Sequence, residues 1–262
     1  MKILLASMEL KSLTGQPMYT YNLAKGLIEK GHEVDCVGLD TGAPIENMLE
    51  ELGADVFNYV QFKTFGGHYD LAIISEDIPQ YLKCFTADKI YNLCHSMNEC
   101  DRPIKDGITG YITPRTQISD HWGIEAEIVP IPIDTDKFKV KREKQDKYII
   151  LAPCSREELR KPMLLNLISR ANKDTEVWLV GEGTLKEAEN VDNVKLFPPT
   201  TDIIDFMKKA DEVAGIFIGT VTLEAWAMGI KTSVYDEKGN WEYVEPQKVY
   251  DYKEITNKIL NL

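Results

Sequence analysis

The sequence alternates short runs of β-branched residues with amphipathic helical stretches along most of its length. This alternation is typical of βαβ units, which build a parallel sheet buried on both faces. Leu23, Ala24 and Leu27 share one face of a helix predicted over residues 18–31, which ends at Gly31. Strands are predicted at residues 2–7, 32–39, 69–75, 89–94, 110–114 and 127–133, and again at 148–154, 176–181, 193–198, 212–218 and 231–236. The fold class is therefore predicted to be α/β.

A charged segment, DTDKFKVKREKQDK at 134–147, interrupts this rhythm and is interpreted as a linker. The pattern predicts an N-terminal Rossmann-like domain at 1–133 and a C-terminal one at 148–262. In such sheets ligands bind outside the carboxyl ends of the strands, so two halves that face each other would form a binding cleft.

Composition excludes several classes of protein. The formal net charge is −12, which repels nucleic acid in general, so no nucleic-acid partner is expected. The five cysteines are odd in number and form no C-x-x-C pair, which favours reduced thiols and a cytoplasmic location. No apolar stretch is long enough to span a bilayer, which leaves a soluble protein or peripheral attachment to a membrane.

The common phosphate and metal motifs are missing. After the first strand the segment MELKSLTGQPMY has the single glycine Gly15 in place of G-x-G-x-x-G, which disfavours a nicotinamide cofactor. There is no P-loop motif, which argues against a P-loop kinase or ATPase. H-E-x-x-H is absent, and Cys94 with His95 lacks further ligands, so neither a metal nor another cofactor is expected.

Two cations follow the strand at 148–154 in the segment CSREELRKP. Arg156 and Lys161 are five residues apart where this loop enters a helix, so they could converge on one diphosphate. The alternative is a solvated pair at a helix start, and the spacing alone is compatible with both. Two cations in the first turn of a helix oppose its dipole, which favours an anion-binding function.

The segment GTVTLEAWAMGIKTSVYD at 219–236 predicts a second anion site. A helix that starts near Thr220 would direct the backbone N–H groups of Thr220, Val221 and Thr222 at a phosphate, and Gly219 would permit close approach. Glu224 then lies in the first two turns, where a carboxylate can accept hydrogen bonds from ribose hydroxyls. The alternative is an acid that only stabilises the helix dipole.

Together these segments resemble the GT-B glycosyltransferases, in particular the large retaining family known as glycosyl transferases group 1. The resemblance runs through most of the chain: GHEVDCVGLD, EIVPIPIDTDKF, REELRKP, LVGEGTLKEAE, TVTLEAWAMGIKTSVYD and GNWEYV. It implies two Rossmann-like domains that face a central cleft, with residues 1–133 on the acceptor side and 148–262 binding the nucleotide sugar. It also implies transfer with retention, without a metal.

The resemblance implies roles for individual residues. Arg156 and Lys161 would neutralise the leaving diphosphate, and Glu224 would hold the ribose. His95 would lie near the donor sugar, although a lone histidine after a strand is more often structural. The remaining positions implied to contact the donor nucleotide are Gly15, Gly181, Gly183, Pro198, Gly219, Thr220 and Val221.

The chain also departs from the family pattern. Ile216 stands eight positions before Glu224, where the family has a glutamate that contacts the transferred sugar, and the loop between Asp211 and Gly219 is short. Pro162 replaces a usual glycine, and the final segment EITNKILNL resembles the remnant of a crossing helix. The predicted function is transfer of a sugar from a nucleoside diphosphate sugar to a glycan, lipid or small molecule. The alternatives are a catalytically silent protein that binds a sugar nucleotide or a partner, and a phage-type DNA base glycosyltransferase.

Overall fold

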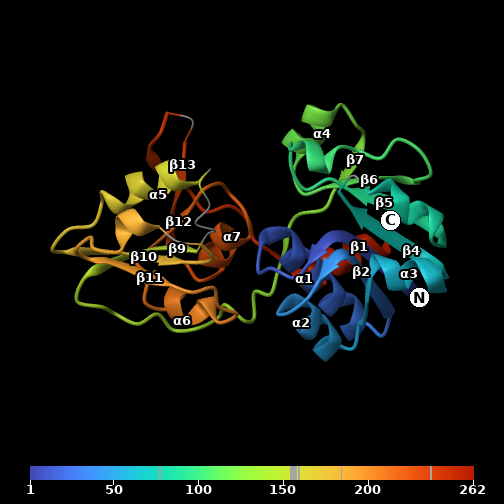
Figure 1. The fold of residues 1–262 in the computed structure, drawn as a ribbon, viewed down its shortest axis with the longest axis horizontal. Helices are drawn as coiled ribbons and strands as arrows, with labels where there is room; N and C mark the ends of the chain where they lie inside the picture. Colours follow the sequence, from blue (N-terminus) through green and yellow to red (C-terminus); the bar gives the residue numbers. More distant parts are fainter. Residues whose placement is uncertain (77, 154–157, 159, 184, 237) are drawn as a thin grey trace. The chain divides into compact units, whose positions relative to one another are not determined.

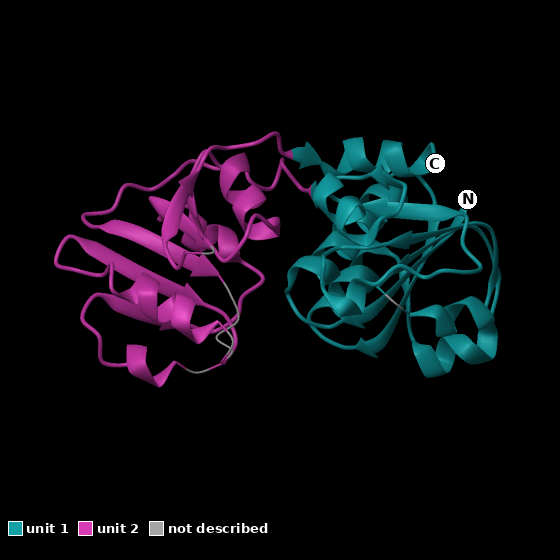
Figure 2. Cartoon of the chain, turned by 90° about the horizontal axis from the view of Figure 1, so that it is seen from above, with its two compact units in different colours: residues 1–132, 250–262 teal, residues 133–249 magenta. Residues whose placement is uncertain are grey.

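The computed structural model describes residues 1–76, 78–153, 158, 160–183, 185–236 and 238–262. The chain divides into two compact units, shown in different colours in Figure 2. Unit 1 contains residues 1–132 and 250–262, and unit 2 contains residues 133–249. The chain enters unit 2 after Pro132 and leaves it after Val249, and two short strands lie at these passages: β8 (Pro132–Ile133) and β15 (Tyr250–Asp251).

Within the described residues, unit 1 is built on a seven-stranded parallel sheet with the order β3-β2-β1-β4-β5-β6-β7 (Figure 1). The strands are β1 (Lys2–Leu10), β2 (Glu33–Thr41), β3 (Asp55–Asn58), β4 (His68–Ser75), β5 (Thr86–Leu93), β6 (Gly110–Thr113) and β7 (Ala126–Ile128). The helices are α1 (Gly15–Glu29), α2 (Ile45–Leu52), α3 (Tyr59–Phe65), η1 (Pro79–Lys83), η2 (Glu99–Asp101), α4 (Thr116–Trp122) and α8 (Tyr252–Leu260). The sequence predicts every one of these strands except β3.

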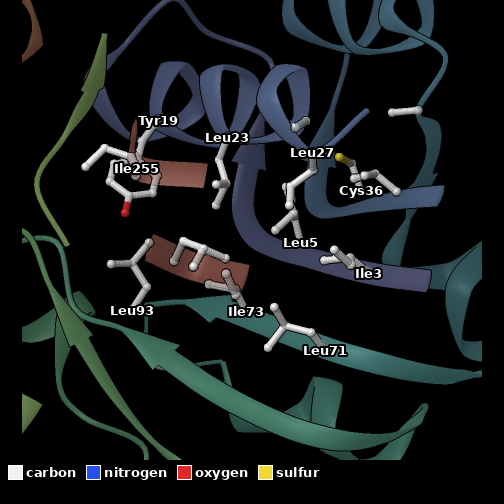
Figure 3. Close-up of a cluster of buried hydrophobic side chains, with 14 of the residues drawn as sticks. Ile3, Leu5, Tyr19, Leu23, Leu27, Cys36, Leu71, Ile73, Leu93 and Ile255 are labelled. Carbon is white, nitrogen blue, oxygen red and sulfur yellow. The ribbon is translucent and has the colours of Figure 1, made fainter. Parts of the chain in front are cut away.

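The core of unit 1 lies between the sheet and the helices on each face. Figure 3 shows Leu23 and Leu27 of α1 directed toward the strands that carry Leu5 and Ile73. These side chains are at most 3% exposed. A second cluster is rich in aromatic rings: Phe62, Tyr69, Tyr81 and Phe85. A parallel sheet covered on both faces in this way needs continuous apolar strands, which is why the sequence pattern predicts them.

Helix α8 packs on α1, within unit 1. Ile255 and Ile259 are buried against the α1 face, and the Tyr252 hydroxyl donates to both carboxylate oxygens of Glu29 at 2.9 and 2.7 Å. The sequence-based boundary placed residues 250–262 in the C-terminal domain, and that part of the boundary is wrong. The final helix has an apolar stripe, and the surface that buries this stripe belongs to the first helix of the chain.

Gly26 allows α1 and α8 to approach closely. A Cβ atom at this position would overlap the Thr256 hydroxyl and lie 3.1 Å from the Tyr252 ring. Gly26→Ala is expected to lower the free energy of unfolding by about 1–2 kcal/mol, because overpacking outweighs the better helix propensity of alanine. Urea unfolding monitored by circular dichroism measures this change. The double variant with Thr256→Ala should recover part of the loss, and a Gly26→Ala protein as stable as the wild type would contradict the prediction.

Unit 2 is built, within its described residues, on a six-stranded sheet with the order β11-β10-β9-β12-β13-β14. Its strands are β9 (Tyr148–Pro153), β10 (Thr175–Val180), β11 (Val194–Phe197), β12 (Glu212–Gly215), β13 (Lys231–Tyr235) and β14 (Trp241–Val244). β14 is antiparallel to its neighbour β13, and the other described pairs are parallel. Its helices are α5 (Lys161–Ile168), η3 (Lys186–Ala188), α6 (Ile203–Met207) and α7 (Thr220–Ala227). The sequence predicts all of these strands except β14.

A buried carboxylate joins three strands at the amino edge of this sheet. Glu212, 1% exposed at the start of β12, accepts two hydrogen bonds from Arg170 at 2.7 and 2.9 Å. The hydroxyls of Ser233 on β13 and Tyr148 on β9 donate to the same carboxylate at 2.6 and 3.0 Å. Burial alone would raise the pKa of Glu212, but the Arg170 and Ser233 hydrogen bonds hold this pKa below its usual value.

Candidate functional site

The strand order of unit 2 has a switch point between β9 and β12. The chain moves from β9 to β10 and β11 on one side and returns to β12 and β13 on the other. The direction therefore reverses between β9 and β12, and ligands of open α/β sheets bind at the carboxyl ends of the strands at such a point. The segments that follow these two strands lead into α5 and α7.

Lys161 is the first residue of α5. Its ammonium group lies 2.6 Å from a Glu187 oxygen and 3.7 Å from a Glu158 oxygen. The hydrogen bond to Glu187 raises the pKa of Lys161, so its charge is secure at neutral pH. Arg156, its predicted partner, lies outside the described residues. The structure thus adds Glu187 of η3, which sequence reasoning missed, as a carboxylate that holds Lys161 in place.

Helix α7 starts at Thr220, as the sequence predicts. The backbone N–H groups of Thr220, Val221 and Thr222 belong to the first turn, where a helix provides no internal acceptor for them. The Gly219 N–H is occupied, since it donates to the Thr222 hydroxyl at 2.8 Å. Phe217, an exposed residue that sequence reasoning missed, lies against Gly219, where a Cβ atom would come 2.8 Å from its ring. A side chain at position 219 would therefore require the Phe217 ring to move aside.

Glu224 lies in the second turn of α7 and is 7% exposed. Burial raises the pKa of Glu224 to about 7, and the positive charge of Lys137 acts in the opposite direction. A carboxyl group with this pKa is poised between its neutral and ionised forms at physiological pH. Hydrogen-bond donors such as ribose hydroxyls would favour the ionised form. This property distinguishes Glu224 from a solvated acid that only stabilises a helix end.

The other predicted nucleotide contacts of unit 2 follow two further strands. Gly181 and Gly183 come directly after β10, both with positive φ, at 153° and 88°. Pro198 comes directly after β11 and is exposed. Because the carboxyl ends of parallel strands share one edge of a sheet, these residues lie on the same edge as the starts of α5 and α7.

In unit 1, His95 follows β5 at the carboxyl edge of the sheet. Its Nε2 lies 3.3 Å from the Ser75 hydroxyl, and its ring makes an edge contact with Tyr19 at 4.9 Å between centroids. Its backbone N–H donates to Asp101 at 3.3 Å. Burial lowers the pKa of His95 to about 4, although the charge of Asp101 acts in the opposite direction. The imidazole is therefore neutral at pH 7 and can exchange hydrogen bonds but carries no charge.

Gly15 starts α1, directly after the loop that follows β1. The neighbouring strand in the sheet, β4, ends at Ser75 and leads into Glu76, which sequence reasoning missed. Glu76 has a positive φ of 70°, and its Oε2 accepts a hydrogen bond from the Met8 N–H at 2.9 Å. Burial, with help from Asp101, raises the pKa of Glu76 to about 7, while the Met8 hydrogen bond opposes this. The only sequence signal was an acid directly after a buried strand.

Of the predicted residues that the structure describes, Gly15 and His95 belong to unit 1 and the others belong to unit 2. Among the described residues no three histidine, cysteine, aspartate or glutamate side chains are placed to hold a metal ion. Likewise, no helix in the described part of the chain is long and apolar enough to cross a membrane.

No protein-family model and no curated protein matches this chain. Several solved structures do. TarM aligns with a TM-score of 0.62 at 12% identity, over 100% of this chain and 91% of that chain. A glycosyltransferase from Rickettsia africae ESF-5 aligns with a TM-score of 0.59 at 12% identity, over 88% of this chain and 78% of that chain. The structure of S. aureus MnaA with UDP aligns with a TM-score of 0.58 at 13% identity, over 100% of this chain and 87% of that chain.

The chain has the GT-B fold. The predicted fold class is therefore confirmed, and so is the resemblance to GT-B glycosyltransferases. At 12–13% identity this likeness establishes the fold alone. A GT-B chain carries its chemistry in particular side chains rather than in its topology.

Proposed function

We propose that the chain is a glycosyltransferase that moves a sugar from a nucleoside diphosphate sugar to an acceptor, with unit 2 holding the donor nucleotide. The observation that carries the proposal is the arrangement around the unit 2 switch point. Lys161 begins α5 after β9, and the first turn of α7 follows β12. The buried Glu224 belongs to the same helix. A cation, a helix N-terminus and a carboxylate match the diphosphate and ribose of such a donor.

These groups would act on the bond that breaks. Cleavage between the anomeric carbon and the diphosphate develops negative charge on the leaving group. Lys161 and the first-turn N–H groups of α7 would stabilise this charge more strongly in the transition state than in the bound donor, and this difference accelerates the reaction. Fixed protein charges then perform the task that a divalent metal performs elsewhere. Transfer should therefore persist in the presence of a metal chelator.

His95 and Glu76 suit the sugar and acceptor part of this reaction. The neutral imidazole of His95 can exchange a hydrogen bond with a sugar hydroxyl without a cost for burying charge. With a pKa of about 7, Glu76 can accept a proton from an acceptor hydroxyl as the carboxylate and can return that proton as the carboxylic acid. We propose transfer with retention, and NMR of the anomeric proton of the product tests it. An inverted anomer would contradict this part of the proposal.

Lys161→Ala is expected to weaken nucleoside diphosphate binding at least tenfold, a loss of about 1.4 kcal/mol or more. The reason is that removing the cation leaves the diphosphate opposite two acids, Glu158 and Glu187. Calorimetric titration with UDP, GDP and ADP measures the change. UDP is the first choice because the structurally similar S. aureus MnaA was solved with it.

Lys208→Ala provides a matched control for this experiment. The Lys208 side chain is 28% exposed, against 30% for Lys161, and it also pairs with a carboxylate, that of Asp205 at 2.7 Å. Lys208 lies just before β12, at the amino edge of the sheet. Lys208→Ala should therefore leave the affinity for nucleoside diphosphates unchanged. Equal losses in both variants would point to a general charge effect. Absence of binding by every nucleotide would refute the proposal.

Ile216, directly after β12, supports a second candidate function, a sugar-nucleotide binder without catalysis. An isoleucine cannot provide the polar contact to the transferred sugar that a carboxylate would. The two functions differ in donor turnover. Slow hydrolysis of the sugar donor by the wild type, lost in Arg156→Ala, would favour the enzyme. Tight nucleotide binding with no turnover of any donor would favour the binder.

A further inference from the structure

Phe217 exposes an aromatic ring at the carboxyl edge of the unit 2 sheet. The residue follows the end of β12 and is 60% exposed. Its neighbours Ile216 and Ile218 are half-buried, so three successive apolar residues occupy a connection where polar residues are usual. The other phenylalanines of unit 2 are buried or half-buried: Phe138, Phe197 and Phe206. Packing within the unit does not account for the Phe217 ring, because an exposed face adds nothing to the core.

Contacts at both ends of this connection fix where the ring lies. At Gly215 a Cβ atom would come 2.7 Å from Thr222 Cγ2 and 3.1 Å from the Phe217 carbonyl oxygen. At Gly219 a Cβ atom would come 2.8 Å from Cε2 of the Phe217 ring. The Gly219 N–H donates to the Thr222 hydroxyl, and this hydroxyl donates to the Gly219 carbonyl oxygen, both at 2.8 Å. The ring therefore lies beside the residue that precedes α7, and a ligand that covers it pays little for ordering the connection.

A role for this ring rests on the proposed function, in which Lys161 and the first turn of α7 hold the diphosphate. β9 and β12 are neighbours in the sheet, so the starts of α5 and α7 share one part of the carboxyl edge with Phe217. Glu224, proposed for the ribose, lies one turn inside α7, whereas Phe217 lies ahead of the first residue of this helix. In a nucleoside diphosphate sugar the ribose and the transferred sugar are attached to opposite ends of the diphosphate. A ribose at Glu224 therefore leaves the sugar on the Phe217 side.

A hexose presents a surface that such a ring can cover. The hydroxyl groups of a pyranose project mainly from its rim, and the C–H bonds on one face form an apolar patch. An aromatic ring laid on this patch removes apolar surface of both partners from water, and the positive C–H hydrogens meet the negative face of the ring. The adjacent Ile216 has no polar group for a sugar hydroxyl, so an apolar contact suits this side of the site.

We propose that Phe217 is a specificity-determining residue whose ring stacks on the apolar face of the transferred sugar, while Lys161 and the first turn of α7 hold the diphosphate. The ring then contributes to the affinity for a sugar nucleotide and not to the affinity for the free nucleotide. This difference separates a contact with the sugar from a contact with the nucleobase and from a purely structural role, because only the first depends on the presence of the sugar.

Calorimetric titration of the full chain with UDP, UDP-glucose, UDP-galactose and UDP-N-acetylglucosamine tests the proposal. For the sugar nucleotide that the wild type binds most tightly, Phe217→Ala should lose about fivefold in affinity. For UDP the same variant should lose less than about twofold. Phe217→Tyr keeps the ring face and should retain the wild-type affinity for both ligands. Equal losses for UDP and the sugar nucleotide would overturn the contact with the sugar, and so would an unchanged affinity for the sugar nucleotide in Phe217→Ala.

Tyr243→Ala is the matched control. Tyr243 is an aromatic residue of the same unit and is 50% exposed against 60% for Phe217, but it pairs with Ser233 in the middle of β13, away from the carboxyl edge. It should leave every affinity unchanged, and a selective loss equal to that of Phe217→Ala would overturn the assignment. Binding of UDP by the wild type without a selective loss in Phe217→Ala would overturn the role of Phe217 alone. Absence of binding by UDP and by all three sugar nucleotides would refute the proposed function as well.

Discussion

Arg170→Ala is expected to lower the free energy of unfolding by about 3–5 kcal/mol, because it leaves a buried carboxylate without its main partner. Glu212 is 1% exposed, and Arg170 supplies two of the hydrogen bonds that keep it ionised. Ser233 and Tyr148 would remain as donors, but neither carries a positive charge. Guanidinium chloride unfolding at pH 7 measures the effect.

Lys231→Ala is the control for this prediction. Its ammonium group is also close to Glu212, at 3.6 Å, but its side chain is 50% exposed and water screens it. Lys231→Ala should therefore lower the free energy of unfolding by less than about 1 kcal/mol. The pKa of Glu212 is held below its usual value, so its contribution to stability is present above the pKa of the unfolded chain and is lost as the pH falls. If Lys231→Ala and Arg170→Ala lowered the free energy of unfolding by comparable amounts, the proposed role of Arg170 would be contradicted.

Glu224→Gln should make the protein more stable at pH 8 and a poorer nucleotide binder. The pKa of Glu224 is about 7 in the folded protein against an ordinary 4.5, so the fold favours the protonated form. The stabilisation that comes from protonated Glu224 is fully present below pH 4.5 and is lost as the pH rises through 7. Glutamine imitates the protonated acid at every pH, so the variant should be about 2–3 kcal/mol more stable at pH 8.

The same change should weaken UDP binding at least tenfold, because an amide accepts hydrogen bonds from ribose hydroxyls less strongly than a carboxylate does. Unfolding curves at pH 4.5, 6 and 8 test the stability, and calorimetry at pH 8 tests the affinity. At pH 4.5 the stability gain should vanish. Glu143→Gln, at an exposed acid of the same unit, should alter neither quantity. A gain in stability that does not depend on pH would show that the carboxylate charge is not its cause.

Most of the fold could be predicted from the sequence, because buried parallel strands such as Leu71–Ile74 leave long apolar runs. Strands β3 and β14 could not, since each has four residues and lies at the edge of its sheet, where polar residues are tolerated. The periodicity of α8 does not reveal the unit to which it belongs, and the sequence indication for it was the resemblance of EITNKILNL to the remnant of a crossing helix. An apolar stripe indicates a helix that must be buried, but not which surface buries it.

The candidate site likewise contains residues that local sequence patterns reveal and residues that they do not. Lys161 and Glu224 could be singled out because Lys161 stands at a strand-to-helix turn and Glu224 lies in the first two turns of a helix, and both are local patterns. The Glu187 partner of Lys161 could not, since it comes from a different βα segment. The importance of Glu76 depends on its burial and on a hydrogen bond from Met8, 68 residues earlier in the chain. No local pattern contains that information.

The return of the chain to unit 1 has a consequence for synthesis on the ribosome. Residues 133–249, the whole of unit 2, are translated before α8. Because domains fold as units during translation, unit 2 can fold while unit 1 is still incomplete. Throughout that interval the α1 surface that later receives Ile255 and Ile259 is exposed to solvent. A nascent chain that ends at Val249 is therefore the stage at which a chaperone that binds exposed apolar surface would find its target.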